Sequence, residues 1–183
     1  MKKKQVMLIS CAAFVLGSGI WGLNPWVKIK NFTPQTISLP PITEIESFID
    51  EQEKPFLSEL RSPLLKKTIH WAKKNQQTEV SILYLHGFSA SPMEMDPIPQ
   101  GIAKKIGANL YSTRLSGHGM RDGSSLGKIP PEAWLQDSYE AFQVAKLLGK
   151  KVILVANSMG SANALWLASL FPESIDSMVL FSP

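Results

Sequence analysis

The chain has 183 residues, of which 44% are hydrophobic and 19% are charged, so its composition is that of an ordinary globular protein with enough residues for one domain. The formal net charge of +4 does not indicate nucleic-acid binding, because three of the basic residues are the consecutive Lys2, Lys3 and Lys4 and no basic and aromatic residues interleave elsewhere. The single cysteine, Cys11, excludes a disulfide within this chain and a cysteine-based zinc site.

The amino terminus predicts a signal peptide or a membrane anchor at residues 1–23. Residues 5–23 follow the three lysines and carry no charge. This apolar segment is long enough to span a bilayer. Gly17-Ser18-Gly19 offers a cleavage site for a signal peptide, whereas Trp26 suits the interface of an uncleaved anchor. A third interpretation is a lipoprotein signal that ends at Cys11. By the positive-inside rule, the following domain is expected to be membrane-anchored on the extracytoplasmic side, or secreted.

Residues 24–75 are interpreted as a proline-rich spacer followed by short helices. The prolines between residues 24 and 41 favour an extended chain. Thr43 and Glu46 have the spacing of a capping box, which predicts a short helix that ends before Pro55.

A second helix is predicted to begin at Ser62-Pro63 and to continue through Lys74. This prediction places His70 on a helix. We expect a surface or packing role for this histidine and assign it no chemistry.

Residues 76–183 alternate short apolar stretches with helical patterns, which predicts an α/β domain. The expected strands are residues 79–85, 108–113, 152–155 and 177–181. The expected helices are residues 91–106, which prolines interrupt, 131–148 and 161–171. At the start of the first of these helices, Ser91 is the expected N-cap and Glu94 the expected partner in a capping box. This alternation implies a mostly parallel sheet with right-handed crossovers.

The stretch KVILVANSMG, residues 151–160, has the pattern of a strand, a sharp turn at Ser158 and a helix. That context is the one in which a serine serves as the nucleophile of a G-x-S-x-G elbow. The turn requires small residues two positions before and two positions after the serine. Ala156 and Gly160 meet this requirement, although Ala156 departs from the glycine of the usual pattern.

Four segments, in this order and at these separations, resemble the N-terminal half of an α/β-hydrolase. The resemblance covers about residues 80–183 and is closest to the carboxylesterase and monoacylglycerol-lipase-like branch, which includes the serine aminopeptidase type. The segments are LYLHGF at 83–88, RLSGHG at 114–119, VANSMG at 155–160 and VLFSP at 179–183.

The resemblance implies that Ser158 attacks a carboxylic ester and forms an acyl-enzyme. It further implies that the backbone N–H groups of Met159 and Phe88 form the oxyanion hole, with His86 and Gly87 as turn residues. His86 is not the expected base, because the order in the family is serine, acid, histidine. No metal ion and no organic cofactor are implied.

Three acidic residues match no motif of the family, and one further histidine lies within a matching segment. Asp96, Asp122 and Asp137 are expected to be solvated. His118, in the Gly-His-Gly segment, is expected to fix the conformation of its loop.

The resemblance places the catalytic acid and histidine after strands that would follow Pro183. We therefore expect an α/β-hydrolase fold truncated after the sixth strand of the usual count, in a chain that is a fragment of a longer protein. The expected function is that of a carboxylic ester hydrolase of the EC 3.1.1 type, whose partners are a small ester and, through the N-terminal segment, the membrane. Peptidase, thioesterase and acyltransferase activities share these motifs. The alternative is a truncated, non-catalytic, membrane-anchored protein that serves as a binding module or remnant. Nothing in the sequence predicts the oligomeric state.

Overall fold

The computed structural model describes residues 32–183, in which one compact unit runs from Pro34 to Pro183. The predicted signal peptide or anchor at residues 1–23 lies outside the described residues. Among residues 32–183 no helix is both long enough and apolar enough to cross a membrane. The compact unit begins well before residue 76, so residues 34–75, interpreted from sequence as spacer and short helices, contribute to the same unit as the predicted hydrolase domain.

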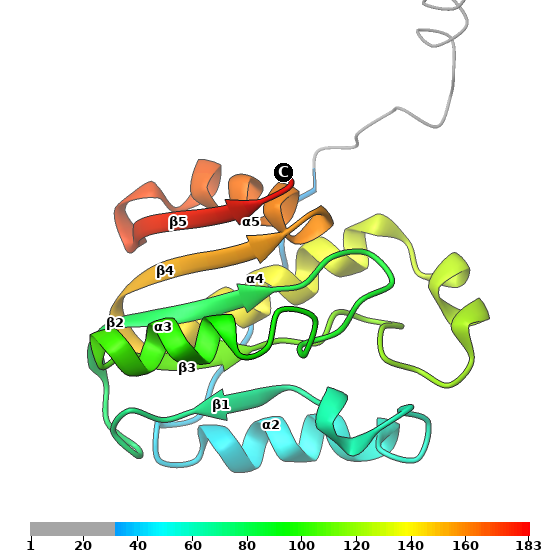
Figure 1. Ribbon diagram of the computed structural model, residues 1–183, viewed down its shortest axis with the longest axis horizontal. Coiled ribbons are helices and arrows are strands. Elements are labelled where there is room, and N and C mark those ends of the chain that lie inside the picture. Colours follow the sequence, from blue (N-terminus) through cyan, green and yellow to red (C-terminus); the bar gives the residue numbers. More distant parts are fainter. Residues whose placement is uncertain (1–31) are drawn as a thin grey trace, which may run out of the picture. The chain divides into compact units, whose positions relative to one another are not determined.

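The unit is built around a five-stranded sheet with the strand order β1-β3-β2-β4-β5 (Figure 1). Strands β2 to β5 run parallel to their neighbours, whereas β1 pairs antiparallel with β3. The expected mostly parallel α/β sheet is thus confirmed. The strand bounds are β1 (Thr68–His70), β2 (Thr78–Leu85), β3 (Asn109–Ser112), β4 (Gly149–Asn157) and β5 (Ile175–Phe181).

Helices cover both faces of this sheet. Helices α2, α4 and α5 contribute to one core with the sheet, and α3 packs on the opposite face (Figure 1). Successive side chains of a strand point to opposite faces, so Leu83 enters the first core and Tyr84 the second, and β2 is apolar along most of its length. The helices are α2 (Ile45–Glu53), α3 (Ile98–Ile106), α4 (Pro131–Leu148) and α5 (Met159–Leu170). Short 3₁₀ turns lie at Lys54–Phe56, Pro63–Leu65, Gly123–Lys128 and Pro172–Ser174.

Helices α4 and α5 match their predictions closely, and α2 is present without its predicted cap. Helix α4 has the predicted bounds, and α5 begins at Met159, directly after Ser158. The predicted capping box of α2 is wrong, because its N-cap is Glu44 and no side chain caps the helix. Glu46 instead forms an ion pair with Lys74, which lies on a distant segment.

The helix predicted from Ser62 through Lys74 is wrong. The Ser62 side chain accepts a hydrogen bond from the Leu64 N–H at 3.3 Å, and the turn that it caps ends at Leu65. The chain then forms β1, in which Ile69 is buried and the exposed His70 pairs with Leu110 of β3. The β-branched residues of this short segment suit an edge strand, and pairing with β3 overrides the local helix signal.

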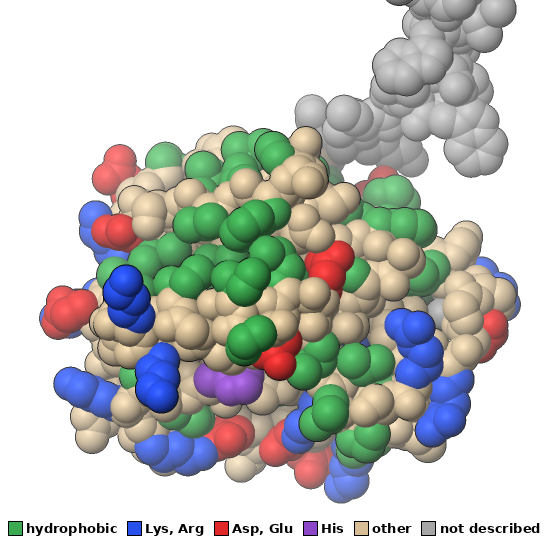
Figure 2. Space-filling model, in the orientation of Figure 1, with side chains coloured by type: hydrophobic (Ala, Val, Ile, Leu, Met, Phe, Trp, Pro, Cys, Tyr) green, Lys and Arg blue, Asp and Glu red, His purple; other side chains and the backbone are tan. Residues whose placement is uncertain are grey.

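Strand β5 pairs only with β4 among the described residues, so its other edge has no partner strand there. Met178 and Val179 in this strand are 39% and 40% exposed. Figure 2 shows apolar side chains gathered over β4 and β5, on the face that α3 leaves partly uncovered.

Candidate active site

Ser158 lies at the sharp turn between β4 and α5. Its backbone has φ 50° and ψ −119°, a conformation that residues other than glycine seldom adopt. The Ser158 N–H donates to the Phe181 carbonyl of β5 at 2.9 Å, which ties the turn to the neighbouring strand. The residue is exposed to solvent. Such backbone strain persists only where the surrounding structure fixes it, and it concentrates at functional sites.

The glycine two positions after Ser158 has a clear steric reason. A β-carbon on Gly160 would lie 2.3 Å from the carbonyl oxygen of Leu85 and 2.7 Å from that of His86. Helix α5 therefore packs directly against the end of β2, and only glycine fits there. Ala156 is fully buried in β4, and its carbonyl accepts a hydrogen bond from the Ser161 hydroxyl at 3.2 Å.

The turn that follows β2 lies against Ser158. A β-carbon on Gly87 would be 3.3 Å from the β-carbon of Ser158. The Ala90 N–H donates to the Gly87 carbonyl at 3.3 Å, and Ser89 within this turn has φ 57°. The fold thus brings together the Ser158 turn and the segment that follows β2, which carries the half-exposed Phe88.

At this junction, the backbone N–H groups of Phe88 and Met159 have no hydrogen-bond acceptor within residues 32–183. The Gly87 carbonyl faces the His86 ring at 2.8 Å, and in a trans peptide the Phe88 N–H points the opposite way. Met159 is the first residue of α5, where N–H groups lack intrahelical partners and the helix dipole is positive. These two N–H groups are available to a negatively charged oxygen.

His86 is fully buried, and both of its ring nitrogens are engaged. Nε2 accepts the Leu115 N–H at 3.1 Å, so the proton resides on Nδ1, which donates to the Gly87 carbonyl. Burial lowers the pKa of His86 from 6.5 to about 3. The ring therefore stays neutral and has no nitrogen free to accept a proton from Ser158, which agrees with the structural role expected for this residue.

His118 lies in an aromatic cluster with Phe88 and Trp134. Its ring centroid is 6.0 Å from that of Phe88 and 5.6 Å from that of Trp134, and the ring is fully buried. Its Nδ1 is 3.1 Å from the Ser116 carbonyl, which also accepts the Trp134 indole N–H at 3.0 Å. Burial lowers the pKa of His118. These contacts fix the loop after β3, the role predicted for this histidine.

Asp137 was predicted to be solvated, and this prediction is wrong. The carboxylate of Asp137 accepts the Ser116 N–H at 2.6 Å, and burial raises its pKa. Asp96 is exposed as predicted. Asp122 is also exposed and caps a 3₁₀ turn by accepting the Ser124 N–H at 2.9 Å.

Sequence reasoning missed a buried ion pair that anchors the same loop. The Arg114 guanidinium donates to both carboxylate oxygens of Glu53, at 2.9 Å and 2.7 Å, and both side chains are almost completely buried. Glu53 also accepts the Lys67 N–H at 3.1 Å. The residues are 61 positions apart, so no local sequence pattern could have indicated the pair.

Glu94 was expected to complete a capping box with Ser91, and this expectation is wrong. No helix begins there, since α3 starts at Ile98. The Glu94 carboxylate instead accepts the Gly87 N–H at 2.9 Å and the Tyr84 hydroxyl at 3.1 Å. It therefore contacts the turn that carries Phe88.

No histidine or carboxylate forms a hydrogen bond with the Ser158 hydroxyl within the part of the chain that the structure describes. Over the same residues, no group of three histidine, cysteine, aspartate or glutamate side chains is arranged to hold a metal ion. The described site thus consists of an exposed serine and two available backbone donors.

Comparisons with known proteins identify the family and the fold. The family model described as alpha/beta hydrolase fold matches residues 80–183. A search of curated proteins found no match. A solved structure from work on the metagenome-derived lipolytic enzymes LipS and LipT is 24% identical, with a TM-score of 0.56 over 64% of this chain and 45% of that chain. A structure of Est1E from Butyrivibrio proteoclasticus with bound ferulic acid is 20% identical, with a TM-score of 0.52 over 62% of this chain and 46% of that chain. At these identities the structures share a fold, and this chain spans less than half of their length.

Proposed function

The chain belongs to the α/β-hydrolase fold family, and we propose on that basis that the protein is a serine hydrolase that cleaves carboxylic esters through Ser158. One observation supports this proposal above the others. An exposed serine is held at φ 50° beside two backbone N–H groups that have no acceptor within residues 32–183. A serine that only caps or packs has no need of a strained backbone next to free donors.

In the proposed mechanism, the Ser158 hydroxyl attacks the ester carbonyl carbon while a general base takes its proton. The carbonyl oxygen becomes negatively charged in the tetrahedral intermediate, and the Phe88 and Met159 N–H groups bind it. Donors placed in advance where charge develops are worth roughly 3–4 kcal/mol each in comparable sites. Loss of the alcohol leaves an acyl group on Ser158, and water then releases the acid.

The base and its acidic partner are proposed to lie beyond Pro183, in the order serine, acid, histidine. Without a base, Ser158 is an ordinary alcohol and a weak nucleophile. His86 does not supply this base, because both of its ring nitrogens are already hydrogen-bonded.

The substrate is proposed to carry an apolar acyl group of medium or long length. Phe88 is 54% exposed beside Ser158, and its ring lies edge-on to Trp134 at 5.7 Å. This pair gives the site an apolar wall. We further propose that residues 1–23 hold the domain at the outer face of the membrane or direct its secretion, which cell fractionation and N-terminal sequencing would test.

The proposal is tested by treating the whole protein with a fluorophosphonate probe, which labels activated serines, and by measuring hydrolysis of p-nitrophenyl esters of increasing acyl length. Ser158→Ala should abolish both labelling and hydrolysis. Ser169→Ala is the matched control, because Ser169 is an exposed serine near the end of α5, and it should leave both unchanged.

Two outcomes would decide against the proposal. Labelling that persists in the Ser158→Ala variant would place the reactive serine elsewhere. A complete protein that contains an acid and a histidine after Pro183, yet neither reacts with the probe nor cleaves esters, would favour the non-catalytic binding module or remnant instead.

A further inference from the structure

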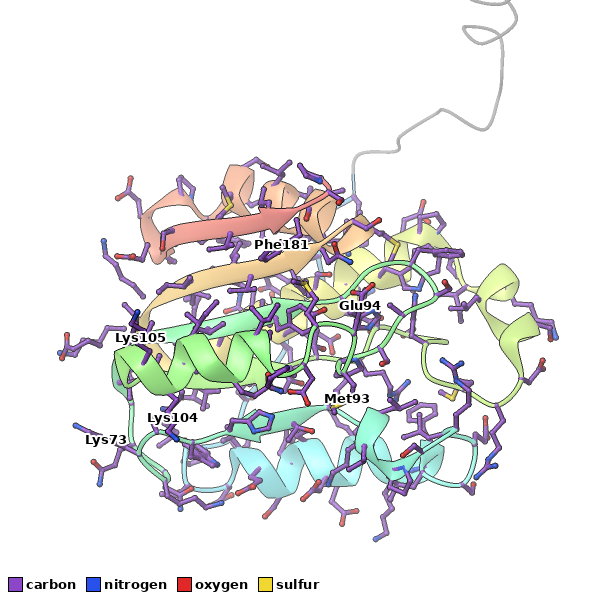
Figure 3. The ribbon with its side chains drawn as sticks, viewed as in Figure 1. Lys73, Met93, Glu94, Lys104, Lys105 and Phe181 are labelled. Carbon is purple, nitrogen blue, oxygen red and sulfur yellow. The ribbon has the colours of Figure 1, made fainter. Side chains whose placement is uncertain are left out.

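We propose that Glu94 is a positioning residue of this site. Its carboxylate fixes the Gly87 peptide so that the neighbouring Phe88 N–H is presented beside Ser158. The inference rests on the proposed function, because it concerns the oxyanion hole assigned there. Glu94 lies on the loop between β2 and α3, beyond the carboxyl end of β2 (Figure 3).

One carboxylate oxygen of Glu94 accepts hydrogen bonds from two donors, a backbone N–H and a side-chain hydroxyl. Oε2 accepts the Gly87 N–H at 2.9 Å and the Tyr84 hydroxyl at 3.1 Å. Tyr84 is fully buried in the central strand β2, and burial raises the pKa of its hydroxyl, which therefore stays protonated and can donate. Hydrogen bonds to an ionised carboxylate are roughly twice as strong as bonds between neutral groups. A rigid strand residue thus holds the carboxylate in place, and the carboxylate holds the turn.

The peptide between His86 and Gly87 is restrained at both ends. Its N–H faces Glu94, and its carbonyl faces α5, where a β-carbon on Gly160 would approach it to 2.7 Å. Because the peptide is planar, these two contacts set its orientation.

The following peptide, between Gly87 and Phe88, is held through its carbonyl. The His86 ring lies 2.8 Å from this oxygen, and the Ala90 N–H donates to it at 3.3 Å. Of the two N–H groups of these peptides, the one without a partner in residues 32–183 is therefore that of Phe88. Loss of the Glu94 contact would free the first peptide to rotate about the flexible Gly87 and would move this donor.

Packing alone does not explain why the Glu94 carboxylate turns toward the backbone. Glu94 is an exposed residue and belongs to neither hydrophobic core. Asp96 lies two positions later on the same loop, is also exposed, and forms no side-chain hydrogen bond or ion pair among the described residues. Asp96 is therefore a matched control for the removal of a loop carboxylate.

The experiment compares Glu94→Ala, Glu94→Gln and Asp96→Ala in the whole protein, by kcat and KM for a p-nitrophenyl ester and by the rate of fluorophosphonate labelling. Displacing a catalytic group by about 1 Å can cost on the order of 100-fold in rate. We expect Glu94→Ala to lower kcat about 10-fold to 100-fold, within that range, with KM nearly unchanged. Glu94→Gln should retain most of kcat, because its amide oxygen can accept the same two bonds. Asp96→Ala should match the wild type.

Amide hydrogen exchange at Gly87 and Phe88 provides a readout that does not depend on activity, and it should be faster in Glu94→Ala only. A Glu94→Ala variant with wild-type kcat, or with unchanged exchange at these amides, would overturn the inference. Equal losses in Glu94→Ala and Glu94→Gln, accompanied by a lower melting temperature, would also overturn it, because they indicate a structural role only. A wild-type protein that does not react with the probe would instead contradict the proposed function, on which the inference rests.

Discussion

The Nε2 atom of His86 accepts the backbone N–H of Leu115 at 3.1 Å, and this hydrogen bond joins the turn after β2 to the loop after β3. It exists only while the imidazole is neutral, because a protonated Nε2 would direct a hydrogen atom at another donor. Burial, which lowers the pKa of His86 to about 3, and the bond to Leu115 therefore act in the same direction. The turn that carries Phe88 is consequently sensitive to acid.

The first prediction concerns this pH dependence. The pKa of His86 falls from 6.5 in the unfolded chain to about 3 in the folded chain, so between these pH values the unfolded state binds a proton that the folded state does not. The free energy of unfolding should therefore decrease as the pH falls from 6.5 toward 3, by up to about 1.4 kcal/mol per pH unit from this residue. Urea unfolding at several pH values should show a shallower dependence for His86→Gln than for wild type. Equal slopes would contradict the prediction. His118, whose pKa is also lowered and whose ring centroid lies 4.8 Å from that of His86, is present in both proteins.

The second prediction concerns the close approach of α5 to β2. Gly160→Ala places a β-carbon 2.3 Å from a backbone oxygen of Leu85, and backbone cannot move aside as a side-chain tip can. We expect a loss of about 1–3 kcal/mol in unfolding free energy, as for other overpacked sites, together with reduced probe labelling at Ser158.

Gly101→Ala is the control for this substitution. Gly101 lies within α3, and a β-carbon there would meet no atom within 4 Å. Alanine in a helix is more stable than glycine by roughly 0.5–1 kcal/mol, so this variant should gain stability. A Gly160→Ala variant as stable as Gly101→Ala would show that α5 can shift without cost.

The third prediction concerns the buried pair of Arg114 and Glu53. Removal of one partner leaves an uncompensated buried charge, so Glu53→Ala should destabilise the fold by about 3–5 kcal/mol. The double variant Glu53→Leu/Arg114→Met should lose much less, because neither charge remains. A cycle of urea unfolding measurements on the single and double variants would test this. Single-variant losses that simply add up in the double variant would mean that the two side chains do not interact.

The sequence predicted the parallel strands and α4 because their signals are local. A buried apolar run such as that of β2, or the helical period of residues 131–148, needs no knowledge of distant residues. The small residue at Gly160 followed from steric limits at the turn of Ser158, whereas the role of Phe88 was predicted from the resemblance to α/β-hydrolases.

The missed features depend on residues far apart in the chain. Strand β1 forms because β3 offers an edge, and Glu53 is buried because Arg114 arrives from another segment. Glu94 was misread because its hydrogen bonds with Gly87 and Tyr84, 7 and 10 positions earlier in the chain, have no sequence signature, whereas its spacing to Ser91 imitates a capping box. Local propensity thus gave the wrong structure where a non-local partner offered a stronger contact.

The last prediction concerns the strain at Ser158. A residue with a β-carbon held at φ 50° and ψ −119° costs of order 1–3 kcal/mol, whereas glycine adopts positive φ freely. Ser158→Ala keeps the strain and Ser158→Gly relieves it, and both variants lack the hydroxyl. We expect Ser158→Gly to be more stable than Ser158→Ala by about 1 kcal/mol, after allowance for the greater entropy of unfolded glycine. Urea unfolding of the two variants measures the difference directly. If the alanine variant is equally stable, the turn is not strained, and the argument that this serine is held in place for catalysis loses its main physical support.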